Sequence, residues 1–144
     1  LYHASPMHDI GKMTVPHEIL HKPGKYTPEE FEVMKSHTTN AYKLLSGSKR
    51  KLIKSAAIIA YQHHEKWDGS GYPRGLKGSD IHIYGRIIAL ADVFDALTHQ
   101  RCYKTAWTVD DAVAFIQEQR GFHFDPELVD LMISHLDQFA DIVK

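Results

Sequence analysis

Residues 83–98 constrain the fold most, because they form a nearly uninterrupted apolar stretch of helical length that carries two carboxylates. Asp92 and Asp95 stand three positions apart, and Asp92 lies on an apolar side of the predicted helix. Burying an unpaired carboxylate is unfavourable. Asp92 is therefore expected to face a cation, which is either a metal ion or the side chain of Arg86 or Lys12.

Sequence signals for helix starts indicate where other helices of the chain begin. Thr27 is a predicted N-cap, Pro28 occupies the first helical position, and Glu30 completes a capping box. No stretch alternates with the two-residue period of a strand. The predicted fold class is all-α, a compact irregular helical bundle. The predicted helices cover residues 28–47, 51–65, 83–98, 108–121 and 125–135.

Composition limits the classes of partner. The 144 residues suit one domain, with 43% hydrophobic and 24% charged residues, as in soluble globular proteins. A net charge of -1 argues against a long nucleic acid as ligand. The chain has no apolar run of membrane-spanning length and no leader peptide, and Cys102 is its single cysteine. These features predict a cytoplasmic protein without membrane contact from this segment.

Eleven histidines are the unusual feature of the composition, and two of them are adjacent. His63 and His64 end an apolar helical run, and neighbouring positions on a helix point about 100 degrees apart. They cannot share one core position, but both can reach a cluster of cations. The loop that follows contains Gly71 and Pro73, which hold Tyr72 on a turn close to the histidines.

A histidine followed directly by an aspartate stands near the start of the chain. Gly11 is expected to end a short helix there, which puts His8 and Asp9 at a helix end. His37 flanks the buried stripe of helix 28–47 and can point inward, although a lone histidine in that place is more often a core residue. The inward-capable donors from separate segments are His8, Asp9, His37, His63, His64 and Asp92.

These donors are imidazoles and carboxylates only, a set that suits iron, manganese, zinc or nickel. Asp9 is the natural bridge between two ions, because a carboxylate has two oxygens. Paired cations can activate water for attack on phosphorus and neutralise charge on phosphoryl oxygens. The implied chemistry is phosphoester hydrolysis.

Several motifs together resemble the HD-GYP family, a branch of the HD phosphohydrolases that cleaves the bacterial second messenger cyclic di-GMP to the linear dinucleotide or GMP. They run over nearly the whole chain. The motifs are His8-Asp9-Ile10-Gly11-Lys12, Lys22-Pro23-Gly24-Lys25, His63-His64-Glu65, Asp68-Gly69-Ser70-Gly71-Tyr72-Pro73, Asp92-Val93-Phe94-Asp95-Ala96-Leu97-Thr98 and Tyr103-Lys104.

The resemblance implies roles for these residues. The six donors become ligands of two or three divalent ions, with iron or manganese expected. Asp9 and Lys12 become the catalytic residues, with Lys12 near the scissile phosphate. Tyr72, Arg101 and Lys104 become the residues that hold the substrate's phosphates. Without the resemblance, a solvated basic turn is an alternative interpretation of Arg101 and Lys104.

The chain departs from the family pattern in two places. The family has a further histidine ligand on an upstream helix, and some members add a glutamate; this chain starts after both. Residues 1–144 are therefore expected to be an HD-GYP domain truncated at its N-terminus, lacking the N-terminal helices and impaired in metal binding. Cys102 stands where the family commonly has proline.

The predicted function is metal-dependent hydrolysis of cyclic di-GMP in bacterial signalling. Two alternatives stay open: a general HD nucleotidase, and a module that binds cyclic di-GMP or docks on a partner without turnover. A homodimer is an expectation, because missing helices would leave an apolar face uncovered. A receiver or sensor domain is expected ahead of this segment, as in relatives.

Overall fold

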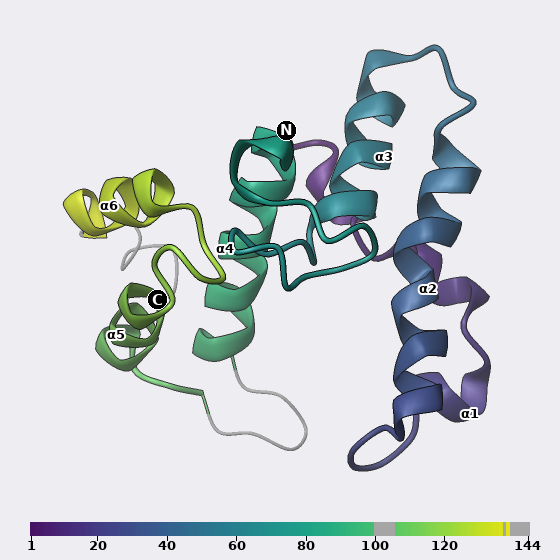
Figure 1. Ribbon diagram of the computed structural model, residues 1–144, viewed down its shortest axis with the longest axis horizontal. Coiled ribbons are helices and arrows are strands. Elements are labelled where there is room, and N and C mark those ends of the chain that lie inside the picture. The colour runs from purple at the N-terminus through teal and green to yellow at the C-terminus, as the bar shows by residue number, and fades with distance from the viewer. Residues whose placement is uncertain (100–105, 137, 139–144) are drawn as a thin grey trace.

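The computed structural model describes residues 1–99, 106–136 and 138, and every regular element in this part of the chain is helical (Figure 1). Within it, an isolated bridge between Arg120 and Phe124 is the one strand-like feature. The all-α prediction is confirmed. The helices, with η for short 3-10 helices, are η1 (Ser5–Met7), η2 (Ile10–Thr14), α1 (His17–Leu20), α2 (Pro28–Leu45), α3 (Lys51–Gln62), η3 (Gly78–Asp80), α4 (Ile83–Thr98), α5 (Val109–Glu118) and α6 (Pro126–Ser134).

The start of α2 is the predicted capping box. The Thr27 hydroxyl accepts a hydrogen bond from the Glu30 amide at 3.3 Å, and a Glu30 carboxylate oxygen accepts one from the Thr27 amide at 2.7 Å. These bonds satisfy amides that have no partner within the helix. Phe31 of α2 is 43% exposed and lies edge-on to Tyr72. The buried residues of α2 are Met34, His37, Thr38, Ala41 and Leu45.

The short helix η2 packs against α2 at Gly11. The expectation that Gly11 ends a helix is wrong, because Gly11 lies inside η2. A Cβ atom at this position would lie 1.9 Å from the carbonyl oxygen of His37. Glycine is needed here for close approach of two backbones.

Four predicted helix ends shift by one to three residues. The helix predicted to reach residue 47 ends at Leu45. The helix predicted to reach Glu65 ends at Gln62, so the paired histidines begin the loop after it. The helix predicted to end at Gly121 ends at Glu118. The last helix ends at Ser134, one residue before the expected end. Helix ends depend on capping contacts that periodicity does not reveal.

Helix α4 lies at the centre of the bundle, with α3 on one side and α5 and α6 on the other (Figure 1). Ile88 packs in a core cluster with α3, and Leu90, Phe94 and Leu97 pack in a second one with α5 and α6. Such apolar residues around α4 explain why the stretch is almost uniformly apolar. In the described part of the chain, no helix combines the length and apolarity needed to cross a membrane.

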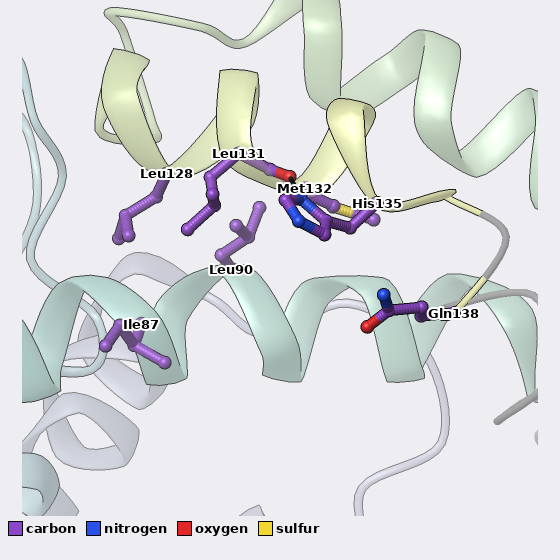
Figure 2. Close-up of a pocket in the computed structure, with 7 residues that line it drawn as sticks. All are labelled: Ile87, Leu90, Leu128, Leu131, Met132, His135 and Gln138. Atoms are coloured by element: carbon purple, nitrogen blue, oxygen red, sulfur yellow. Dashed lines mark hydrogen bonds between the residues drawn. The ribbon is translucent and has the colours of Figure 1, made fainter.

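An apolar pocket lies between α4 and α6 (Figure 2). Ile87 and Leu90 line it from α4, and Leu128, Leu131 and Met132 line it from α6. Leu131 is 57% exposed at this pocket. None of the predicted site residues that the structure describes lines it.

Candidate metal centre

Separate segments bring the six predicted donors to one place. The chain reaches the centre from the η1 to η2 junction, the middle of α2, the C-terminal end of α3 and the middle of α4. The donors on these segments are, in the same order, His8 with Asp9, His37, His63 with His64, and Asp92.

Asp9 lies among the histidines. Its Oδ1 atom is 3.5 Å from His37 Nε2 and 3.7 Å from His63 Nε2, while its Oδ2 atom is 3.3 Å from His8 Nε2. Ligand atoms of Asp9, His37, His63 and His64 all lie within 4.8 Å of one another. The two oxygens of Asp9 thus face different imidazoles, as a bridging carboxylate requires.

Asp92 lies beside the ring of His8. Its Oδ1 atom is 3.8 Å from His8 Nε2, and its side chain is 33% exposed. The alternative partners named from the sequence are engaged elsewhere: Arg86 contacts Asp125 at 2.6 Å, and Lys12 contacts Asp9 Oδ2 at 2.5 Å. Asp92 therefore faces the centre and not either of these cations.

Backbone carbonyls orient three of the rings. The Nδ1 atoms of His8, His37 and His63 lie 2.9, 2.7 and 3.2 Å from the carbonyl oxygens of Ser5, Met34 and Ile59. This contact fixes the ring and leaves Nε2 toward the centre, as in many metal-binding histidines.

Unpaired buried atoms provide the test of fit. Asp9 Oδ1, His37 Nε2 and His63 Nε2 are buried and make no hydrogen bond with any residue that the structure describes. Buried polar atoms nearly always have a partner, because losing water without replacement is unfavourable. Converging, unpaired nitrogen and oxygen donors are what a divalent transition metal ion satisfies, so the cluster fits such an ion.

The local electrostatics favour the metal-binding protonation states. Burial raises the pKa of Asp9, but contacts with His63, His8 and Lys12 outweigh burial and hold that pKa well below its usual range. Burial lowers the pKa of His37, and it lowers the pKa of His64 to about 2. A charged Asp9 and neutral His37 and His64 are the forms that bind metal. His8 differs, since its contact with Asp9 raises its pKa despite burial.

The loop after the paired histidines folds back over them. The Tyr72 amide donates to the His64 carbonyl at 3.1 Å, and the two rings stack with centroids 4.8 Å apart. A Cβ atom on Gly71 would lie 2.3 Å from the Lys66 amide nitrogen. Glycine there lets the loop approach the end of α3, which puts Tyr72 at the centre's edge.

The sequence did not indicate a role for Glu65 beyond membership of a motif. Its side chain is buried, 2% exposed, and accepts hydrogen bonds from the amides of Arg74 at 2.8 Å and Leu76 at 2.9 Å. The available signal was an acid three residues after the end of α3, ahead of a glycine-rich loop whose backbone amides need hydrogen-bond partners. The predicted phosphate-binding residues Arg101 and Lys104, with Cys102, lie outside the described residues.

Comparisons with known proteins agree with this geometry. Residues 1–128 match the model of a family described as HD domain. The chain is 50% identical over 139 residues to the 3'3'-cGAMP-specific phosphodiesterase 2 of Vibrio cholerae and to the cyclic di-GMP phosphodiesterase response regulator RpfG of Xanthomonas campestris. It is 45% identical over 141 residues to a cyclic di-GMP phosphodiesterase of Thermotoga maritima.

These alignments cover 96%, 96% and 98% of this chain but only 27%, 37% and 38% of the relatives, so the chain spans about a third of their length. A crystal structure of a cyclic GMP-AMP specific phosphodiesterase of V. cholerae, V-cGAP3, superposes with a TM-score of 0.67 and 19% identity. It covers 99% of this chain and 40% of that one, and supports the fold. The resemblance to HD-GYP proteins is confirmed, and the chain belongs to the HD domain family.

Proposed function

We propose that this chain is the hydrolytic domain of a cyclic di-GMP phosphodiesterase that yields the linear dinucleotide or GMP. The observation that carries the proposal is the position of Asp9 among the histidines, with Oδ1 facing His37 and His63 and Oδ2 facing His8. The names of the relatives support the substrate class.

The residues proposed to hold metal are the six donors that converge on the centre. Two or three divalent ions, iron or manganese, agree with an all nitrogen and oxygen donor set. When bound, such ions supply Lewis acidity, which lowers the pKa of water and neutralises charge on phosphoryl oxygens. The proposed ligands are His8, Asp9, His37, His63, His64 and Asp92.

The remaining site residues are proposed to act on the substrate's phosphates. Lys12 lies against Asp9 with its side chain 40% exposed, so it can stabilise negative charge on a phosphate at the centre's edge. Tyr72 is proposed to contact a phosphate from its position against His64. Arg101 and Lys104 are proposed as phosphate ligands from the family motif, and a guanidinium and an ammonium suit that task.

The mixed dinucleotide 3'3'-cGAMP is a second candidate substrate. It is favoured by one specific observation, which is that a relative at 50% identity is named for this substrate. Both dinucleotides carry two phosphodiester bonds, so the same phosphate contacts serve either one.

The setting of the domain is also proposed. One relative is named a response regulator, which supports control by a receiver or sensor domain in a cytoplasmic signalling protein. Apolar residues at the surface, such as Leu44 and Leu52 at 62% and 46% exposure, support self-association into a homodimer.

The test is a product assay on the protein loaded with manganese or with iron under anaerobic conditions. Cyclic di-GMP, 3'3'-cGAMP and nucleoside monophosphates are incubated separately, and products are separated by chromatography. Cleavage of a cyclic dinucleotide that is lost in Asp9→Asn supports the proposal. Cleavage of monophosphates alone indicates a general nucleotidase, and binding of cyclic di-GMP with full recovery of intact ligand indicates a module without turnover.

A further inference from the structure

Glu65 is a buried acid whose side chain takes no part in the metal cluster. Glu65 is only 2% exposed. Among the described residues, no lysine, arginine or histidine nitrogen lies within ion-pair distance of its carboxylate. A carboxylate in such a place needs hydrogen bonds to replace water. The Arg74 amide supplies one to Oε1 and the Leu76 amide supplies one to Oε2.

These two hydrogen bonds connect the beginning and the end of the loop that contains Tyr72. They join the residue that follows His64 to positions nine and eleven residues further along the chain, beyond Tyr72. The Tyr72 amide is held from the other direction by the His64 carbonyl at 3.1 Å. Tyr72 therefore lies between anchors on both sides.

Three side chains contact the ring of Tyr72. It stacks on His64 with an interplanar angle of 29°, and it lies edge-on to Phe31 with centroids 6.1 Å apart. Lys35 Nζ lies 5.7 Å from the centre of the same ring. In Figure 1 the segment between α3 and α4 crosses beside α4, where backbone bonds from Trp67 and Asp68 attach it to the turn before α6.

We propose that Glu65 is a positioning residue, which fixes Tyr72 against His64 through its bonds to the Arg74 and Leu76 amides and so sets substrate affinity. The inference rests on the proposed function. In this role Glu65 neither binds metal nor contacts the reacting atoms. Losing the bonds removes binding that the ground state and the transition state share, so the change falls on KM and not on kcat.

The first test is Glu65→Gln, which keeps size but places an amide NH₂ opposite a backbone N–H. We expect faster hydrogen exchange at residues 70–78, unchanged exchange in α3, unchanged bound metal, and a KM for cyclic di-GMP raised about tenfold with kcat within about threefold. Glu127→Gln, at an exposed glutamate in the first turn of α6, is the matched control and should change none of these.

A second pair of variants removes the bond from its donor side and keeps the test valid if Glu65→Gln does not fold. Arg74→Pro deletes the amide hydrogen that Glu65 accepts, whereas Arg74→Ala keeps it. The exposed Arg74 side chain lies over Tyr61, with its guanidinium carbon 6.0 Å from the ring centre. We expect the proline variant alone to raise KM and loop exchange.

Faster loop exchange with an unchanged KM would overturn the inference and leave the proposed function intact. Loss of metal in parallel with activity would also overturn it, since Glu65 would then act on the cluster. A metal-loaded wild-type protein that cleaves no cyclic dinucleotide overturns the proposed function itself, and the inference with it. Hydrogen exchange at residues 70–78 is measured without substrate. It therefore distinguishes a failure of this inference from a failure of the proposed function.

Discussion

Gly11 lies directly against the backbone of His37, so close that a Cβ atom would meet the His37 carbonyl oxygen at 1.9 Å. We predict that Gly11→Ala destabilises the protein by about 3 kcal/mol, because two backbone segments must separate and neither can repack as a side chain could. Denaturant unfolding measures the loss. Gly47→Ala is the control, since a Cβ atom at Gly47 has nothing within 4 Å. Equal stability of both variants would contradict the prediction.

Asp9→Asn should lower metal affinity by roughly tenfold or more, because it removes the one charge that faces both His37 and His8. Bound metal is measured by elemental analysis after dialysis against limiting manganese. Asp95→Asn is the matched control, since Asp95 is a nearby aspartate of α4 with a side chain 64% exposed and paired with His99. A full metal complement in Asp9→Asn would count against the assignment.

Removing metal should lower thermal stability. The buried Asp9 Oδ1, His37 Nε2 and His63 Nε2 atoms make no hydrogen bond within the described part of the chain, so metal binding should favour the folded state. At a free metal concentration a hundred times Kd the gain is about 2.7 kcal/mol. Scanning calorimetry of the manganese-loaded and chelated protein measures the difference in Tm. A Tm that does not respond to chelation would speak against a metal site here.

Arg86→Met should destabilise the protein by about 3 kcal/mol, because it leaves the Asp125 carboxylate, 2% exposed, without its cation. Arg86 also donates from Nε to the Ile81 carbonyl at 3.0 Å. Arg120→Met, which breaks the exposed pair with Asp130, should cause a much smaller loss. Comparable losses in the two variants would mean that burial of Asp125 is not the cause.

Stability should also fall as pH falls from about 6.5 toward 4, in part through His123. Burial lowers the pKa of His123 from 6.5 to about 4, with the charge of Lys66 adding to the effect. Between these pH values the unfolded chain binds a proton that the folded chain does not. The free energy of unfolding therefore decreases as pH drops. His123→Phe keeps the stacked contact with Phe124 and should flatten the unfolding free energy in this range. An unchanged slope would refute this origin.

Local sequence determined the elements. Helix α4 spans the predicted Ile83–Thr98, because a continuous apolar run leaves little freedom in where a buried helix lies. Thr27 and Glu30 marked the start of α2, since a capping box acts between neighbouring residues. The kinds of metal donor were also readable, because softness and charge belong to the side chain itself.

Tertiary structure decided which donors meet and what holds the loop above them. That Asp9 lies between His37 and His8 follows from the packing of η2 on α2, which periodicity does not encode. Glu65 finds its partners in backbone amides, which every residue except proline carries, so no pattern of side chains could identify them. Arg86 likewise meets Asp125 across 39 positions, where several other acids were equally available in sequence. Local chemistry restricts each residue's options, and only the folded chain selects among them.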